Sequence, residues 1–369
     1  MDKFSLFDVI DGHVHIERVE DTGKFQTTLD EVSAVQAGVA CQNDTGMTNT
    51  NPAGFVLKSR DPGRFFILAG LEHSSLFQAS SHSLQPDEQV ERLLSIGVDG
   101  VKILASKPNW RKRLNQPVNG PYFKEFFKIC ADNGLPLLWH VADPEEFWNK
   151  DRLPEWAQKK GWGYDESFPS KEDLYRESLQ VLDDYPGLVV IFPHFYFLSA
   201  DLDRAGSILN KYPHVYFDLA PGIELLYHLS EDRKRSIDFI NEYSDRILFG
   251  TDIVSSHSIV EAQIRTGILL RFLSSDESFR LPQGSDPLLG KPEDGIIHGL
   301  KLPGGIVHSI TTFNFRRIFG PLPKMLNIAA ARDECLRLAE LQAEIDGNNM
   351  EETQGHKAAV KLGKLTLMS

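Results

Sequence analysis

Eight short apolar runs recur along this chain, and a longer amphipathic stretch separates each run from the next. This alternation constrains the fold more than any other feature. Most of the runs are rich in Val, Ile, Leu and Phe, which is typical of strands buried on both faces in a parallel sheet. The runs occupy residues 6–13, 37–43, 64–72, 98–105, 135–141, 188–194, 214–220 and 246–252.

The stretches between the runs carry helical patterns. Residues 86–97, for example, repeat apolar side chains at helical spacing behind Pro86, which suits the start of a helix. Strand and helix alternating eight times predict an α/β fold, a closed (β/α)8 TIM barrel. An open doubly wound sheet is the alternative, and it is disfavoured because no glycine-rich phosphate loop follows the first run. Further helices are expected at 122–134, 170–187, 201–213 and 230–244.

Two segments interrupt the alternation. Residues 142–169 form a long connection after the fifth strand, and their many aromatic side chains favour a lid that excludes water from a site below. Packing of the same rings on the barrel rim is the alternative. Residues 274–304, rich in Ser, Gly and Pro, predict an irregular excursion before the last barrel helix at 305–320.

The C-terminal part of the chain predicts one more helix and then a tail. The helix, at residues 324–345, is expected to pack on the outside of the barrel, where it could serve a homodimer. Residues 347–369 are polar with Gly and Lys, and we expect a flexible tail there. The sequence thus predicts one barrel domain over residues 1–346.

The composition narrows the range of partners and compartments. Fifty-two acidic against 39 basic side chains give a net charge of −13, which argues against a nucleic-acid or anionic membrane surface as the main partner. No apolar run is long enough for a membrane span, and no signal peptide is apparent at the start. The three cysteines lie far apart and are odd in number, so we expect a cytoplasmic protein without disulfides. A small molecule is the expected partner.

The strongest local signal is the segment Asp11-Gly12-His13-Val14-His15, which ends the first strand. Side chains alternate along a strand, so His13 and His15 project to the same face. Two imidazoles on one buried face are costly unless they bind something. A divalent metal ion is one explanation, and two hydrogen-bonded core histidines are the other.

Residues at the ends of later strands favour the metal ion over the hydrogen-bonded core histidines. His140 ends the fifth predicted strand, His194 the sixth and Asp252 the eighth. Active sites of such barrels are built at the carboxyl ends of the strands, so these side chains should converge on one volume with His13 and His15. Imidazole and carboxylate ligands suit zinc, which is our default, and also Mn, Co or Fe(II).

These motifs together resemble those of a known family. The segments DGHVH, LLWH, the PH after the sixth strand, and FGTD are together similar to the amidohydrolase superfamily of metal-dependent (β/α)8 barrels. The closing stretch IVHSITTFNFRRIFG resembles the last helix of that superfamily, especially in the branch of aminocarboxymuconate-semialdehyde decarboxylase and related hydrolases. The resemblance covers residues 7–320.

The resemblance implies a role for each residue of this group. His13, His15, His140 and Asp252 would bind one divalent metal ion, and Asp252 would also act as the general base. His194 would orient water and polarise the substrate, or else bind a second metal ion. In two-metal members a carboxylated lysine on the fourth strand bridges the metals, whereas one metal is the rule in the branch that this chain resembles. We therefore expect Lys102 to anchor substrate or to form a salt bridge.

Weaker candidates lie around this group. Glu72 and His73, Arg111 in the basic cluster of residues 107–113, and Trp148 in the aromatic loop could contact substrate, although structural roles are the alternative for each. Two carboxylates at strand ends, Asp218 and Asp143, could orient ligand histidines from behind.

Four interpretations of this site follow from the sequence. The first is hydrolysis of a C–O or C–N bond in a lactone, ester or amide, by water that the metal ion activates. The second is non-oxidative decarboxylation of an aromatic or muconate-like acid with the same ligands. A barrel that has lost its metal is disfavoured by the intact histidines. A nuclease is disfavoured by the net charge and by Lys102, where an acidic metal bridge would be needed.

Overall fold

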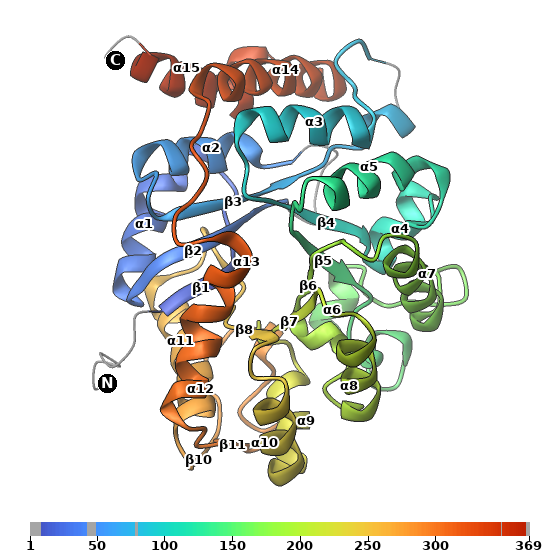
Figure 1. Cartoon of the computed structure of the whole chain (residues 1–369), viewed down its shortest axis with the longest axis vertical. Helices are drawn as coiled ribbons and strands as arrows, with labels where there is room; N and C mark the ends of the chain where they lie inside the picture. The colour runs from blue at the N-terminus through green and yellow to red at the C-terminus, as the bar shows by residue number, and fades with distance from the viewer. Residues whose placement is uncertain (1–8, 43–48, 78–79, 348, 367–369) are drawn as a thin grey trace.

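One curled sheet of nine parallel strands organises the protein (Figure 1). The computed structural model describes residues 9–42, 49–77, 80–347 and 349–366. Every run of the sequence pattern contributes a strand, and the strands follow one another in the order β8-β7-β6-β5-β4-β3-β2-β1-β9. Their bounds are β1 Val9–His15, β2 Ala34–Cys41, β3 Phe65–Gly70, β4 Gly100–Ser106, β5 Leu137–Val141, β6 Val190–Phe192, β7 Val215–Asp218, β8 Ile247–Leu248 and β9 Ile253–Val254.

The sheet closes into a barrel because β8 and β9 are two halves of one broken strand. β8 pairs with β7, and β9 pairs with β1 on the other side. Between the halves, the Gly12 N–H donates to the Phe249 carbonyl at 2.9 Å, and the Asp252 N–H donates to the His13 carbonyl at 2.8 Å. The chain therefore forms an eight-stranded ring, and the prediction of a TIM barrel is confirmed.

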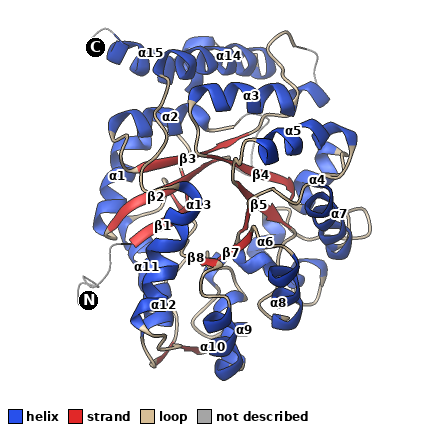
Figure 2. Ribbon diagram, in the orientation of Figure 1, coloured by secondary structure: helices blue, strands red, loops and turns tan. Residues whose placement is uncertain are grey.

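Helices cover the outside of the ring (Figure 2). Helix α3 shows how the sequence sets their ends: Gln85 and Glu88 form a capping box at its start, and Gly97 ends it with a φ of 87°. The covering helices are α1 Thr22–Glu31, α2 Asn51–Arg60, α3 Pro86–Ile96, α4 Pro108–Leu114, α5 Pro121–Asp132, α7 Lys171–Asp184, α8 Leu202–Lys211, α9 Leu225–Glu231, α10 Arg233–Glu242 and α11 Ile259–Ser274.

The inside of the barrel is a packed apolar core, closed at the amino ends of the strands by helix α13 (Asn314–Phe319). Phe315 of this helix packs edge-on against Phe66 at 5.0 Å between ring centroids. At Gly38, a Cβ would lie 2.7 Å from the Gly12 carbonyl oxygen and 3.0 Å from the Phe315 ring, so only glycine fits there. The predicted last helix consists of α12 (Gly304–His308), the π-helical turn η6 (Ser309–Phe313) and α13.

Two insertions lie at the carboxyl ends of the strands. The β5–α7 loop, residues 142–169, contains η3 (Glu145–Trp148) and α6 (Glu155–Lys159) and builds a small apolar cluster of its own around Phe147, Ala157 and Tyr164. The predicted excursion at 274–304 contains the turn η5 (Pro287–Leu289) and two short antiparallel strands, β10 (Ser278–Phe279) and β11 (Ile297–His298).

The C-terminal region confirms one expectation and corrects another. Helix α14 (Ile328–Asp346) packs on α3 and α2 outside the barrel, as predicted, but α15 (Gln354–Thr366) runs along it (Figure 1). The flexible tail predicted from residue 347 onward is wrong for 354–366, because Ala358, Ala359 and Leu362 of α15 are buried. Helix α15 also covers part of the surface of α14, the helix that we expected could serve a homodimer.

Two further observations concern the whole described chain. Cys41, Cys130 and Cys335 are buried as free thiols. Among the described residues, every helix is too short or too polar to cross a membrane.

Candidate metal centre

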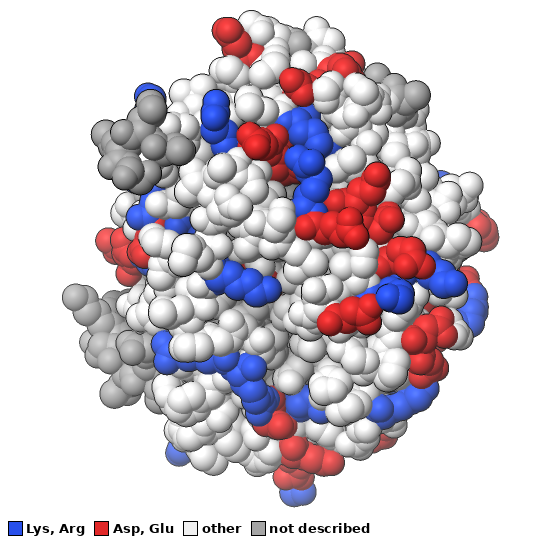
Figure 3. Space-filling model, turned by 45° about the horizontal axis from the view of Figure 1, so that its top comes forward, with Lys and Arg blue, Asp and Glu red and all other residues white. Residues whose placement is uncertain are grey.

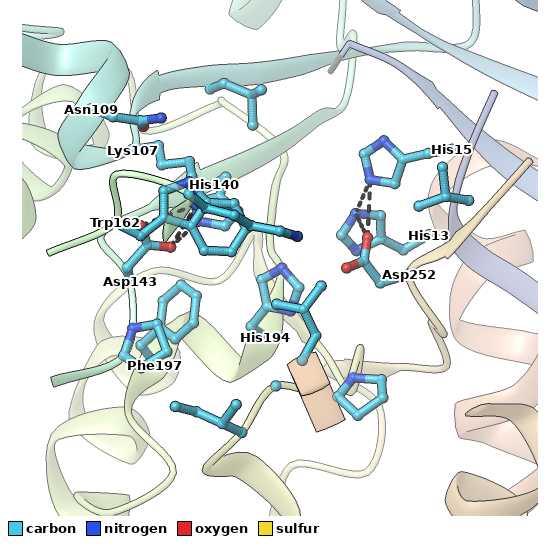
Figure 4. Close-up of a pocket in the computed structure, with 18 of the residues that line it drawn as sticks. His13, His15, Lys107, Asn109, His140, Asp143, Trp162, His194, Phe197 and Asp252 are labelled. Atoms are coloured by element: carbon cyan, nitrogen blue, oxygen red, sulfur yellow. Dashed lines mark hydrogen bonds and ion pairs between the residues drawn. The ribbon is translucent and has the colours of Figure 1, made fainter. Parts of the chain in front are cut away.

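The chemically reactive side chains gather at the carboxyl ends of the strands, opposite the end that Phe315 closes. Figure 4 shows His13, His15 and Asp252 on one side of a cavity and His140 with Asp143 on the other. The cavity has a volume of about 530 Å³, within the range of small-molecule sites. All five residues predicted to surround a metal ion therefore line this one cavity.

The two β1 histidines present their acceptor nitrogens to each other. His13 Nδ1 lies 2.9 Å from Asp218 Oδ2, and His15 Nδ1 lies 3.2 Å from the Gln42 carbonyl oxygen. Since a carboxylate and a carbonyl accept hydrogen bonds, each Nδ1 carries the proton and each Nε2 carries a lone pair. The two Nε2 atoms are 3.0 Å apart. Two lone pairs at that distance repel unless a cation lies beside them.

Asp252 and Lys102 complete this group. Asp252 Oδ1 lies 3.1 Å from His15 Nε2 and 3.7 Å from His13 Nε2. Lys102 of β4, which is 1% exposed, places its Nζ 3.1 Å from His13 Nε2. His13, His15 and Asp252 form the only group in the described part of the chain that is close enough to hold a metal ion. Their two imidazole nitrogens and one carboxylate oxygen fit a divalent cation such as zinc.

The break between β8 and β9 positions Asp252. Asp252 has a φ of 57°, in the left-handed region that non-glycine residues rarely adopt. Its neighbour Thr251 is held from two sides: Asp11 accepts hydrogen bonds from the Thr251 N–H and hydroxyl, and the fully buried Arg265 donates to the Thr251 carbonyl at 3.2 Å. At Gly250 a Cβ would lie 2.9 Å from the Cβ of His13, so glycine is required there.

His194 lies between the two sides of the cavity. It starts the turn η4 (His194–Phe197) directly after β6, and all four residues of the turn have positive φ values between 51° and 57°. The Asp218 carboxylate accepts the His194 backbone N–H at 2.8 Å, and His194 Nδ1 donates to the Ala220 carbonyl at 3.0 Å. The unprotonated Nε2 is thus the ring nitrogen left for chemistry in the cavity.

His140 is not part of the group that can hold a metal ion in this arrangement. Its Nε2 is 3.0 Å from Asp143 Oδ1, and its ring lies 5.2 Å from the His194 ring between centroids. Lys107 and the hydroxyl of Tyr164 also bind the Asp143 carboxylate. Asp143 therefore lies behind His140 as Asp218 lies behind His13, and only Nδ1 of His140 remains to meet a ligand.

Burial keeps these imidazoles neutral. Desolvation lowers the pKa of His13 well below its ordinary value and lowers that of His194, and it brings the pKa of His140 to about 3. Burial alone would raise the pKa of Asp252, but its contacts with His15, His13 and His194 outweigh burial, so the pKa falls well below its usual range. Near neutral pH His13 therefore offers a neutral nitrogen and Asp252 an ionised carboxylate, as metal binding requires.

Four predicted substrate contacts lie elsewhere. Glu72 is fully buried and accepts the Ser74 N–H at 2.7 Å. His73 packs among Trp110, Tyr122 and Phe123. The guanidinium of Arg111 pairs with Glu177, and the Trp148 indole packs on Tyr164 and donates to the Pro169 carbonyl. None of these four lines the cavity, because each has a structural partner of its own.

Part of the cavity wall was not predicted from the sequence. Trp156, Trp162 and Lys160 of the β5–α7 loop line the cavity, as do Asn109 after β4 and Leu288 of η5. The aromatic composition of residues 142–169 did predict a lid, but composition does not say which rings face inward. Leu288 carries no sequence signal, since it lies in the irregular excursion.

Comparison with known proteins gives a family and a fold. The family model described as amidohydrolase matches residues 61–275. No curated protein matches the chain. Among solved structures, a TIM-barrel protein from Bordetella bronchiseptica is similar, with 13% identity and a TM-score of 0.52 over 85% of this chain and 98% of the other. The 5-carboxyvanillate decarboxylase of Sphingomonas paucimobilis is similar over 85% and 99%, with 11% identity and a TM-score of 0.50.

The Asp218→Asn variant should bind zinc about 10-fold to 100-fold more weakly than the wild type, because the amide holds the His13 ring less firmly and lowers its basicity. Isothermal titration of metal-free protein measures this affinity. Asp238→Asn, which changes an exposed aspartate paired with Lys234, should have no effect. Equal affinities for zinc in all three proteins would show that Asp218 does not support a metal ligand.

The buried His73 should make the fold sensitive to acid. Burial lowers its pKa from 6.5 to about 3, so the unfolded chain takes up a proton below pH 6.5 that the folded chain does not. The free energy of unfolding should therefore fall as the pH falls below 6.5, by about 1.4 kcal/mol per pH unit from this residue. In the His73→Asn variant, this contribution to the pH dependence of the free energy of unfolding should be absent. Urea unfolding of both proteins between about pH 6 and pH 5 tests this, and equal slopes would contradict it.

Proposed function

The chain belongs to the amidohydrolase family, and from this premise we propose that it is a metal-dependent hydrolase that cleaves a C–O or C–N bond of a small organic substrate. The substrate is a lactone, ester or amide, carboxylated or cyclic. One observation carries the proposal: the facing Nε2 atoms of His13 and His15 meet the Asp252 carboxylate at the edge of a cavity of about 530 Å³. One divalent ion, zinc by default, is the proposed cofactor.

The residues divide the work of hydrolysis among them. His13, His15 and Asp252 would hold the ion, whereas His140, the further ligand that the sequence predicted, lies outside this group. The bound ion would supply a Lewis acid that lowers the pKa of water to about 7. Asp252 would take the proton from the attacking water and return it to the leaving group. His194 Nε2, which carries a lone pair, would accept a hydrogen bond from that water and orient it.

Decarboxylation is the second candidate, and Lys102 is the observation that favours it. A decarboxylase must deliver a proton to the carbon atom that loses carbon dioxide. The Lys102 ammonium group, buried beside His13 in the cavity wall, is a proton donor that hydrolysis does not use. The similar structure from Sphingomonas paucimobilis is itself a decarboxylase. The same ligand set would serve both reactions.

A small-molecule substrate is also supported by the charge distribution. The net charge is −13, and acidic and basic side chains are interspersed on the face that Figure 3 shows. A nucleic acid would need a continuous positive surface, and a nuclease would need an acidic metal bridge where β4 carries Lys102.

A panel of lactones, esters, amides and hydroxybenzoates separates the two reactions. We expect ring opening or release of alcohol or amine without carbon dioxide. With the best substrate, Asp252→Asn should lower kcat at least about 100-fold while circular dichroism stays unchanged, because the base is lost. His194→Ala should also lower kcat but keep its zinc affinity. Full activity of Asp252→Asn would remove Asp252 from the base role, and release of carbon dioxide would select the second candidate.

The number of metal ions tests the centre itself. Elemental analysis of the purified protein should give about one divalent ion per chain. Lys102→Met should bind that ion at least as tightly, because it removes a cation 3.1 Å from His13 Nε2. Two ions per chain, together with their loss in Lys102→Met, would show instead that a modified lysine bridges a two-metal site.

A further inference from the structure

We propose that the β5–α7 loop provides a subsite for the carboxylate of an otherwise flat, apolar substrate, with Lys160 as its cation. This proposal rests on the proposed function in one respect, namely the bond that reacts at the other side of the cavity. Figure 4 shows Asn109, Lys107 and Trp162 facing His13, His15 and Asp252 across the cavity, with His194 between them. A substrate that spans the cavity would thus meet two chemically different ends.

The two lysines at the loop end differ in how their charge is compensated. Lys107 is buried, and its Nζ lies 2.9 and 3.1 Å from the two carboxylate oxygens of Asp143. Lys160 is exposed at the cavity wall and makes no ion pair with any carboxylate in the described chain. Asp143 therefore neutralises the charge of Lys107, whereas the charge of Lys160 is available to an incoming anion.

Trp162 fixes the place of both cations. Lys107 Nζ lies 4.3 Å from the centroid of the Trp162 ring, and Lys160 Nζ lies 4.8 Å from it. A cation near an aromatic face is held electrostatically by the ring. Lys160 is thereby restrained beside the cavity although it is exposed, so less side-chain entropy is lost when it binds a carboxylate.

The opposite end of the cavity repels a free carboxylate more than the loop end does. Two carboxylates line that end, those of Asp252 and of the half-buried Glu17, against the single buried cation of Lys102. An anion that binds the metal-free protein would therefore place its carboxylate at Lys160, away from Asp252. Charge thus selects one of the two directions in which an elongated molecule could enter.

The body of the substrate would lie against aromatic rings. Phe147, Trp156, Trp162 and Phe197 all line the cavity. Phe197 stacks on the His194 ring at 5.2 Å between centroids, so this apolar wall continues up to the residues proposed to act on water. A planar apolar body fits such a wall better than a hydrated sugar or a phosphorylated chain does.

The test is a binding measurement on metal-free protein with two probes of the same shape. The anion 3-phenylpropanoate and its neutral analogue 4-phenylbutan-2-one are titrated at low salt into the wild type, Lys160→Met and Lys160→Arg. Binding is followed by calorimetry and by the fluorescence of the cavity tryptophans. Lys159→Met is the matched control, because Lys159 is the neighbouring exposed lysine, pairs with Glu155 and does not line the cavity.

We expect the wild type to bind the anion about tenfold more tightly than the ketone, as one charge-assisted contact gives. The preference should fall to about twofold or less in Lys160→Met, persist in Lys160→Arg and Lys159→Met, and weaken with added salt. An unchanged preference in Lys160→Met, an equal loss in Lys159→Met, or no binding of the anion to the wild type would overturn the subsite.

The design separates this proposal from the proposed function. Because the protein carries no metal ion in these titrations, failure to find a hydrolysed substrate does not change their result. If the anion is preferred only after zinc is added, and equally in Lys160→Met, its carboxylate binds at the metal centre. That result overturns the subsite at Lys160 while leaving the metal-dependent reaction in place.

Discussion

The break in the eighth strand is the constraint on which the rest of the site depends. Its two halves must pair with β7 on one side and with β1 on the other, and the four residues between them turn from one partner to the other. The turn puts Asp252 in a left-handed conformation, which costs about 1–2 kcal/mol. Asp11 and Arg265, both buried, offset that strain by binding Thr251. Barrel closure and ligand placement are thus one structural problem.

The sequence predicted the barrel and the convergence of His13, His15 and Asp252, because both depend on local periodicity. Strands buried on both faces produce continuous apolar runs, and the carboxyl ends of these runs point to one place, so His13, His15 and Asp252 could be brought together without coordinates. Roles that depend on a distant partner could not be predicted. Arg111 appeared to be free for substrate, yet Glu177, 66 residues later, binds it. The apolar side chains of α15 are interspersed with polar ones in the sequence. Their burial depends on contacts with α14 and α2, which the local pattern does not show.

The two ends of the barrel follow different physical rules. At the amino ends, Gly38 of β2 packs so closely against Gly12 and Phe315 that an added Cβ would collide, which fixes that position as glycine. At the carboxyl ends, polar side chains are buried in pairs, each histidine with an acceptor on its second nitrogen. The first end stabilises the fold through close packing, and the second end arranges the ligands and keeps them unprotonated.

The β5–α7 loop has an apolar cluster of its own, separate from the two clusters of the barrel. A segment that stabilises itself can exchange residues without weakening the scaffold beneath it. Trp156 and Lys160 line the cavity, so mutations there would change its wall without altering the strands that carry His13 and His15. The architecture therefore favours evolvability: descendants of this protein can acquire new specificities by altering one appendage while inheriting the same reactive centre.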